Sequence, residues 1–335
     1  MTAVSERAQA HVELDPRVLR LRSDVWELDV LPGTGASLAA GRVRLGDSWV
    51  DLLRPTATRH LGEIERCASF AMVPWSNRIR DGVLRFGGRT WQLQHNGADG
   101  TAIHGTTGWA TWDVVERTEG AVTLAYDSTR LVGVNFPWRF AAQVTYALDG
   151  GRLTVTTSVR NLDTEPFPAG FGHHPYFRRT LVAPGALPSP DGDPVLHVPA
   201  ARGFPLEAGM AVGPAGEPAP RADYRVPRPI GRAFVDDVLT DLVRDEPVRI
   251  TYDEGLVVEL RSDPVYAHVV VYAPRGRSYF AVEPVTNVND GFTLHEAGVP
   301  GTGVVVLEPG EHSRGRSRST SSSDRVGGHG PGSPG

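Results

Sequence analysis

The most informative absence in this 335-residue chain is lysine: no lysine occurs, and all 34 basic residues are arginine. A phosphate-binding loop of the G-x-x-x-x-G-K type is therefore excluded, because that loop needs its lysine to contact the phosphates. A lysine Schiff base and a lysine anchor for pyridoxal phosphate are excluded for the same reason. The missing lysine thus removes several nucleotide and carbonyl chemistries from consideration.

Cysteine and long apolar runs are also scarce. Cys67 is the single cysteine, which excludes an internal disulfide and a cysteine-rich zinc site. The apolar runs are too short to cross a bilayer, and residues 1–16 lack the apolar core of a secretory signal. The formal net charge of -5 gives no basic footprint for nucleic acid. We therefore expect a cytoplasmic protein that has neither a membrane nor a nucleic acid as partner.

Short strand-like segments recur along the chain. Val25–Val30 alternates, and the clearest hairpin joins Phe140–Leu148 to Arg152–Val159 across Asp-Gly-Gly. Asp-Gly between alternating segments is a strong hairpin signal. Residues 183–229 are rich in Pro, Gly and Asp and predict a long loop region with isolated strands, while residues 232–243 predict a helical turn at most. Many short strands with regular turns predict an all-β sandwich or barrel.

The composition is uniform over residues 20–310, which predicts one domain over residues 21–312, after a lead-in at residues 1–20. Residues 313–335 differ, because Arg, Ser, Gly and Pro dominate and Val326 is the only sizeable apolar residue. Such a segment buries too little apolar surface to offset the entropy lost on ordering. We therefore predict a disordered C-terminal tail over residues 313–335.

Phe171–Phe177 places two adjacent histidines between Gly172 and a Pro-Tyr-Phe segment. Histidine changes charge near neutral pH, so His174 is a candidate proton donor, with a metal ligand or a satisfied core residue as alternatives. Adjacent residues of an extended strand point to opposite faces, so the two histidines rarely share one ion. No H-x-x-x-H or H-E-x-x-H motif occurs. We predict no metal and no cofactor.

Further polar clusters lie beside apolar or aromatic residues: Asn77-Arg78, His104-Gly105, Asp236-Asp237 and Glu283. Each also has a structural interpretation, as a turn with a surface arginine, a satisfied histidine at a strand end, a cap of a helical turn or a paired surface carboxylate. Trp75 and Trp109 flank polar clusters and could stack on a sugar face. The residue types alone leave both interpretations open.

Taken in order, these clusters resemble the aldose 1-epimerase (galactose mutarotase-like) family. The matching residues are Asn77-Arg78, Gly82–Gly88, His104-Gly105, His174–Phe177, Asp236, Glu283 and Leu307–Glu311. The resemblance covers roughly residues 25–312. It implies an all-β fold, a β-supersandwich with a sugar cleft on one sheet.

The resemblance also implies an isomerase that interconverts the α and β anomers of a free hexose. In the family, a glutamate that matches Glu283 is the general base, and a histidine that matches His174 is the general acid. The base takes the proton of the C1 hydroxyl and the acid protonates the ring oxygen, so that the ring opens and recloses without metal or cofactor. The residues implied to bind sugar hydroxyls or to support the acid are Asn77, Arg78, His104 and Asp236.

Several finer expectations follow from this resemblance. Glu283 should be ionised at rest and His174 protonated, with Asp236, chosen over Asp237, as the carboxylate that holds the imidazolium. Family members usually end with an alternating strand after the Pro-Gly-Glu turn. In this chain residues 314–319 occupy that position without apolar partners, so the strand is either short and polar or altered.

The residue types also allow three other functions. A hexose-6-phosphate 1-epimerase needs arginines near the 6-position, and the candidates are Arg80, Arg178 and Arg179. A non-catalytic carbohydrate-binding or sensing domain needs no acid–base pair. A glycoside hydrolase needs two carboxylates across the bond, for which Glu283 and Asp236 could serve, but it gives the histidine no role. We expect a small-molecule sugar as partner, and a monomer or weak homodimer.

Overall fold

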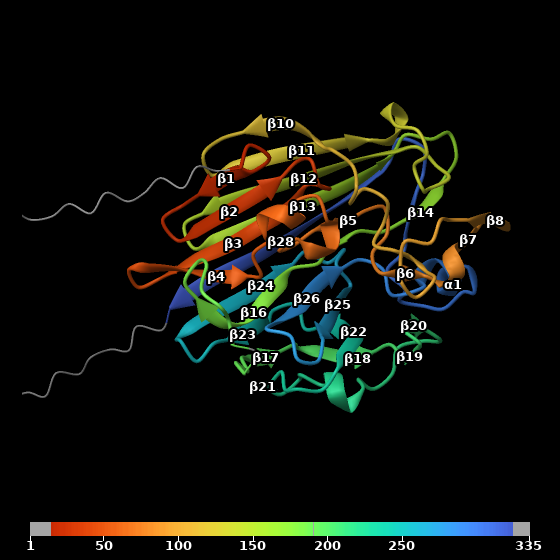
Figure 1. The fold of residues 1–335 in the computed structure, drawn as a ribbon. Coiled ribbons are helices and arrows are strands. Elements are labelled where there is room, and N and C mark those ends of the chain that lie inside the picture. Colours follow the sequence, from red (N-terminus) through yellow and green to blue (C-terminus); the bar gives the residue numbers. More distant parts are fainter. Residues whose placement is uncertain (1–14, 190, 324–335) are drawn as a thin grey trace, which may run out of the picture.

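The computed structural model describes residues 15–189 and 191–323, and strands are the main regular secondary structure of this part of the chain. Two large antiparallel sheets stack on each other, as Figure 1 shows, which confirms the all-β fold class. Within the described residues the helical elements are short: α1 (Gly291–Glu296) and the 3-10 turns Thr58–His60, Ile64–Arg66, Arg80–Gly82, Ser128–Arg130 and Pro220–Ala222.

The larger sheet has eleven strands. Their main order is β1 (Leu19–Arg22), β2 (Trp26–Leu31), β3 (Ser37–Leu45), β4 (Ser48–Leu53), β16 (Tyr176–Val182), β26 (Tyr279–Val285), β25 (His268–Ala273), β22 (Val235–Leu242) and β18 (Ala200–Gly203), with β15 (Gly172–His173) and β5 (Ala71–Met72) attached beside β26. Because β1 begins at Leu19, the predicted lead-in ends slightly earlier than expected, and its residues 1–14 lie outside the described residues.

The second sheet has nine strands. Their order is β10 (Asp113–Arg117), β11 (Ala121–Asp127), β12 (Phe140–Asp149), β13 (Arg152–Asn161), β28 (His312–Ser323), β24 (Leu256–Ser262), β23 (Val248–Thr251), β17 (Val195–His197) and β21 (Arg228–Pro229). The predicted hairpin is confirmed, because β12 and β13 pair in register from Phe140↔Asn161 to Asp149↔Arg152.

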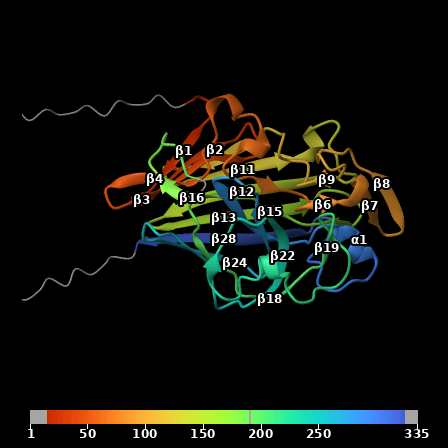
Figure 2. The ribbon, with the colours of Figure 1, turned by 60° about the horizontal axis from the view of Figure 1, so that its bottom comes forward.

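Four two-stranded sheets complete the fold. They are β14 (Phe167–Ala169) with β27 (Val305–Leu307), β19 (Leu206–Glu207) with β20 (Met210–Ala211), β6 (Arg78–Ile79) with β9 (Ala102–Ile103), and β7 (Val83–Phe86) with β8 (Arg89–Gln92). Figures 1 and 2 both show β6, β7, β8 and α1 at the same end of the molecule.

The hydrophobic core lies between the two large sheets. Trp26, Leu28 and Val30 of β2 alternate along one strand and are buried with Tyr146 of β12 in one cluster. Two polar groups inside this core have partners across the sheets: Trp26 Nε1 donates to the Gly151 carbonyl at 2.9 Å, and the Tyr146 hydroxyl donates to the Ala36 carbonyl at 2.8 Å. Buried polar groups need such partners, so these bonds help to set how the sheets stack.

The prediction of a disordered tail beginning at residue 313 is wrong for residues 313–323. These residues form most of β28, which lies between β13 and β24 (Figure 2). A strand with neighbours on both sides satisfies its backbone groups without large apolar side chains of its own. Its Gly315 lies against Tyr266 and Val265, where an added Cβ would approach each to 2.6 Å. Residues 324–335 of the predicted tail lie outside the described residues.

The helical turn predicted over residues 232–243 is also wrong, because β22 occupies Val235–Leu242. The apolar spacing of this segment fits a helical face, but pairing with β18 and β25 on both sides outweighs that local preference. The prediction for residues 183–229 is confirmed, since the strands in it are two to four residues long and separated by loops.

Candidate active site

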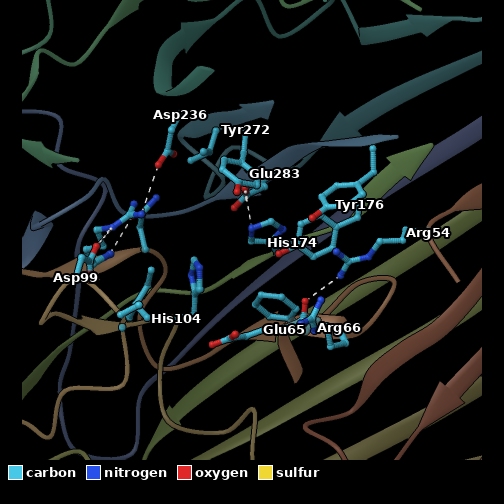
Figure 3. A pocket seen from close by; sticks show the side chains of 18 residues that line it. Arg54, Glu65, Arg66, Asp99, His104, His174, Tyr176, Asp236, Tyr272 and Glu283 are labelled. Atoms are coloured by element: carbon cyan, nitrogen blue, oxygen red, sulfur yellow. Dashed lines mark hydrogen bonds and ion pairs between the residues drawn. The ribbon is translucent and has the colours of Figure 1, made fainter. Parts of the chain in front are cut away.

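The predicted site residues come together around one cavity of about 430 Å3 on the larger sheet. Figure 3 shows its lining side chains. All six predicted residues line it: Asn77, Arg78, His104, His174, Asp236 and Glu283. The cavity volume lies within the range of roughly 300–1,000 Å3 that is usual for small-molecule sites.

Strand register explains how residues far apart in the sequence reach the cavity. Glu283 of β26 pairs with Val270 of β25, and Val270 pairs with Val238 of β22. Two residues along the same strands, Asp236 pairs with Tyr272. Residues i and i+2 of a strand share a face, so the alternation that buries the inner side of the sheet presents Glu283, Asp236 and Tyr272 to the cavity.

The two predicted catalytic residues, His174 and Glu283, are in direct contact. His174 Nε2 lies 3.2 Å from Glu283 Oε1 (Figure 3). His174 lies between β15 and β16, and its backbone N–H donates to the Phe70 carbonyl at 3.0 Å. The two residues are only 5% and 2% exposed. An acid–base pair is therefore held at a buried point of the cavity wall.

Burial acts on the charge of both groups. It lowers the pKa of His174 well below its usual value, with the neighbouring His104 and Arg54 adding to the shift. Burial also raises the pKa of Glu283 well above its usual value, and Asp236 adds to that shift. Both directions oppose the expected ionised Glu283 and protonated His174. The charged and the neutral pair hold the same number of protons and differ only in which side of the 3.2 Å contact holds one of them.

Aromatic rings surround the His174 imidazole. The Phe70 ring stacks on it at 4.9 Å between centroids, and the Tyr176 ring lies at 4.3 Å. The His104 ring meets it edge-on at 5.4 Å. Burial, followed by the charge of Arg78, lowers the pKa of His104 to about 3. His104 is therefore a neutral imidazole at physiological pH, able to donate from one ring nitrogen and accept at the other.

His173 has different surroundings from His174, as the alternation of an extended strand requires. Its Nε2 bonds the Thr157 hydroxyl of β13, in the other large sheet. Burial lowers the pKa of His173 to about 4. One histidine of the pair therefore joins the two sheets, while the other faces the cavity.

Arg78 contacts three polar residues at the end of the cavity beyond the His174–Glu283 pair. Its guanidinium lies 2.9 Å from Asp99 Oδ2 and 3.4 Å from Asp236 Oδ2, and its Nη1 donates to Asn77 Oδ1 at 3.3 Å. The expectation that Asp236 holds the His174 imidazolium is thus wrong, because its ion-pair partner is Arg78. Asp236 nevertheless faces the cavity, whereas Asp237 is paired with Arg221 at 2.7 Å and lies outside the lining.

Sequence reasoning missed four charged residues of the lining, Arg54, Glu65, Arg66 and Asp99. Arg54 directly follows β4, a buried strand, and Asp99 lies in an Asn-Gly-Ala-Asp-Gly loop. A charge at the end of an apolar strand was the signal that identified Glu283, and the same signal could have identified Arg54. For Asp99 the local sequence indicates only a turn.

Several other candidates lie away from the cavity. Trp75 is fully buried and packs on Phe136, and Trp109 is exposed, so neither lines the cavity to stack on a sugar. The three arginines considered for a 6-phosphate are also outside the lining. They form ion pairs elsewhere: Arg80 with Asp290, Arg178 with Asp51 and Arg179 with Asp193.

No group of three or more His, Cys, Asp or Glu side chains in residues 15–189 and 191–323 is arranged to hold a metal ion. In the same part of the chain, no helix has the length and apolar character that crossing a membrane requires.

Comparisons with known proteins show which proteins this chain resembles. The chain is similar to YphB of Escherichia coli K12, with 26% identity over 272 residues, which are 78% of this chain and 85% of YphB. It is also similar to YihR of the same strain, with 34% identity over 126 residues, but that match spans only 37% of this chain and 38% of YihR.

A solved structure shows the same fold. A galactose mutarotase-like protein from Clostridium acetobutylicum superposes with a TM-score of 0.78 at 19% identity, covering 91% of this chain and 95% of that protein. The sequence profile of the family described as aldose 1-epimerase matches residues 28–320, which include every predicted site residue and most of β28. The chain therefore belongs to the aldose 1-epimerase family, a family of isomerases.

Proposed function

We propose that this protein interconverts the α and β anomers of a free hexose, with Glu283 and His174 as its acid–base pair. The observation that carries the proposal is the 3.2 Å contact between His174 Nε2 and Glu283 Oε1 at the wall of a sugar-sized cavity. Two proton-transferring groups at one point suit a reaction that moves one proton off the C1 hydroxyl and another onto the ring oxygen.

Each proton has a defined course in the proposed reaction. The Glu283 carboxylate takes the proton of the C1 hydroxyl as the bond between C1 and the ring oxygen breaks, and protonated His174 gives its proton to that oxygen. The open-chain aldehyde then rotates about the bond between C1 and C2. Closure reverses both transfers and restores the pair, with the new hydroxyl on the other face. Positioned acid and base groups contribute about 10²–10⁴-fold each to such a rate.

The burial of the pair fits this cycle. After ring opening the pair consists of a glutamic acid and a neutral imidazole, which is the state that burial favours. The sugar's own hydroxyl and ring oxygen supply polar contacts to the charged state when the ring is closed. Burial therefore favours the neutral pair and the bound sugar favours the charged pair, so that the two states lie closer in free energy. Ring opening and ring closure can then both proceed readily.

The opposite end of the cavity is suited to bind sugar hydroxyls. Arg78, held by Asp99 and Asp236, offers a rigid fork of donors. The carboxylate oxygens of Asp99 and Asp236 can accept from hydroxyls on either side of that fork. We infer that Asn77, Arg78, His104 and Asp236 hold the C2 and C3 side of the ring while C1 faces the acid–base pair.

Two alternatives make different predictions. A carbohydrate-binding domain without catalysis should bind sugar in calorimetry without accelerating the change of optical rotation. A glycoside hydrolase with Glu283 and Asp236 as its two carboxylates has no use for a histidine 3.2 Å from one of them, and it should release reducing sugar from a glycoside.

The proposal is tested by polarimetry on freshly dissolved α-D-glucose and α-D-galactose. Glu283→Gln and His174→Asn should each remove about 10²–10⁴-fold of the enzymatic acceleration while circular dichroism shows an unchanged fold. The matched controls are Glu296→Gln and His295→Asn, adjacent residues of α1 outside the cavity lining, which should keep the wild-type rate. Near-wild-type mutarotation by either site variant would sink the assignment.

A further inference from the structure

A second arginine of the cavity, Arg54, is held rigidly but has no anionic partner. Its backbone N–H donates to the Tyr176 carbonyl at 2.8 Å. Its guanidinium carbon lies over the Tyr176 ring at 3.9 Å and the Tyr279 ring at 4.5 Å. Its Nη2 donates to the carbonyls of Glu65 and Cys67 at 2.9 and 2.8 Å. The position of this cation is therefore fixed before any ligand binds.

The charge of Arg54 is not neutralised. In the part of the chain that the structure describes, Arg54 takes part in no ion pair, and its buried Nε has no hydrogen-bond acceptor. Arg78, the other arginine deep in the cavity, pairs with both Asp99 and Asp236. A neutral sugar can be bound by an arginine whose charge is already balanced, so the unbalanced guanidinium indicates a ligand that brings its own negative charge.

Arg54 lies on the opposite side of the acid–base pair from the predicted hydroxyl-binding end. Figure 3 shows Asp99 and Asp236 at one end, Arg54 at the other, and His174 with Glu283 between them. Tyr176 links the two sites, because its ring lies 4.3 Å from the His174 ring and 3.9 Å from the Arg54 guanidinium. The Tyr176 ring therefore lies between the Arg54 guanidinium and the His174 imidazole.

This arrangement places Arg54 near one carbon of the sugar. If His174 faces the ring oxygen, as the proposed function requires, the next ring atom beyond that oxygen is C5. The exocyclic C6 group on C5 then extends away from C1, C2 and C3, toward the Arg54 end. The two exposed charged residues at that end, Glu65 and Arg66, carry opposite signs and leave Arg54 as the net positive charge there.

We propose that the physiological substrate, which keeps the free anomeric hydroxyl that the proposed function requires, is a hexose with an anionic C6 substituent, a phosphate or a carboxylate, and that Arg54 binds this group and determines the specificity. The inference rests on the proposed function, since it uses the placement of the ring oxygen at His174. A guanidinium suits this task because its planar fork matches the oxygens of a phosphate or carboxylate.

An anion on Arg54 would also favour the chemistry. After burial and His104, Arg54 is the next cause that lowers the pKa of His174. A bound phosphate or carboxylate would balance that positive charge and make the imidazolium less unfavourable. The substrate would then assist the protonation of the acid that acts on it.

The decisive experiment compares kcat/KM for glucose, glucose 6-phosphate and glucuronate by anomer-exchange NMR, with each sugar's spontaneous rate subtracted. We expect the wild type to favour one anionic sugar by about 10-fold to 100-fold, as hydrogen bonds to a charged group are stronger than neutral ones. The two anionic sugars distinguish phosphate from carboxylate. A wild-type preference within twofold of glucose for both would overturn the proposal.

Substitution then tests whether Arg54 is the cause. Arg54→Met should lower the ratio of anionic to neutral kcat/KM by about 10-fold or more, Arg54→Lys should keep part of it, and Arg59→Met, an exposed arginine outside the lining, should keep all of it. If Arg54→Met lowers the values for all three sugars equally, Arg54 is only a structural clamp and the proposal fails.

Calorimetry separates this result from failure of the proposed function. If no sugar is mutarotated, His174 and Glu283 have been misassigned, but the binding of the same three sugars to His174→Asn still reports on Arg54. Tighter binding of an anionic sugar, reduced by the double substitution His174→Asn with Arg54→Met, would support the specificity role without any turnover. Equal affinities for the charged and the neutral sugars would contradict the specificity role of Arg54.

Discussion

At the scale of single residues, the position of His104 depends on the glycine that follows it. His104 has φ 62° and Gly105 has φ 75°, so two successive residues adopt the left-handed region. Val73 forms an isolated bridge with Gly105, and a Cβ added to Gly105 would lie 2.0 Å from the Val73 carbonyl oxygen. This close backbone approach holds the His104 ring against His174.

We predict that Gly105→Ala lowers both stability and activity. Gly100 is the matched control, because it has φ 79° in the same region of the chain but nothing within 4 Å of an added Cβ. Gly100→Ala should cost only the strain of a positive φ, about 1–2 kcal/mol. Gly105→Ala should cost more than that and should lower kcat as His104 shifts. Urea unfolding and polarimetry measure the two effects, and equal losses in both variants would contradict this account.

The polar clusters, together with the resemblance to the aldose 1-epimerase family, pointed to the six predicted lining residues but not to their partners. The choice of His174 over His173 agrees with the alternation of an extended strand, and the two side chains do face different environments. The partner of Asp236 could not be read in the same way, since Arg78 is more than a hundred positions away in the sequence and reaches Asp236 only through the fold.

At the scale of elements, β28 shows that composition can mislead. Its sequence is His-Ser-Arg-Gly-Arg-Ser-Arg-Ser-Thr-Ser-Ser-Ser, yet it pairs with β13 from Arg152↔Thr320 to Arg160↔His312 and with β24 from Leu256↔Ser323 to Ser262↔Ser317. Arg318 adds an ion pair with Asp263 at 3.0 Å. A middle strand of a sheet takes its order from two neighbours, so its own apolar content need not be high.

We predict that truncation after His312 abolishes cooperative folding. The cut removes the strand between β13 and β24 and exposes two long edges inside the nine-stranded sheet. The loss should exceed the net stability of a typical domain, about 5–15 kcal/mol. Truncation after Ser323 keeps every β28 pairing and is the control. Thermal unfolding followed by circular dichroism compares the two truncated proteins. An unchanged transition in the protein that ends at His312 would show that β28 is dispensable.

At the scale of the whole molecule, several buried histidines make stability depend on pH. Burial lowers the pKa of His173 and His268 to about 4 and that of His104 to about 3, against about 6.5 in an unfolded chain. A lowered folded pKa means that stability is complete above the unfolded value. It is lost as the pH falls from about 6.5 toward the folded values. Glu283 acts in the opposite direction, because its pKa is raised.

We predict that the free energy of unfolding decreases between pH 7 and pH 5, by about 2 kcal/mol for each such histidine before the opposing effect of Glu283. His173→Gln removes one of these groups and should reduce the decrease by about that amount. His312→Gln, at an exposed position, should leave it unchanged. Urea unfolding at pH 7, 6 and 5 measures all three proteins. A decrease in His173→Gln as large as in the wild type would rule out this origin of the pH dependence.

The sequence by itself determined the local properties of this protein. Period-two alternation and turn residues specified the all-β class and the β12–β13 hairpin, and the order of polar clusters pointed to the aldose 1-epimerase family. These features depend on neighbours a few positions apart, which a sequence displays directly.

Only the tertiary structure decided the rest. It placed Asp236 against Arg78, brought Arg54 to the cavity wall between two tyrosines, and made a strand of the serine-rich segment at residues 312–323. The physical reason is common to all three: each outcome depends on which distant strands become neighbours in a sheet, and that is set by the packing of the whole chain.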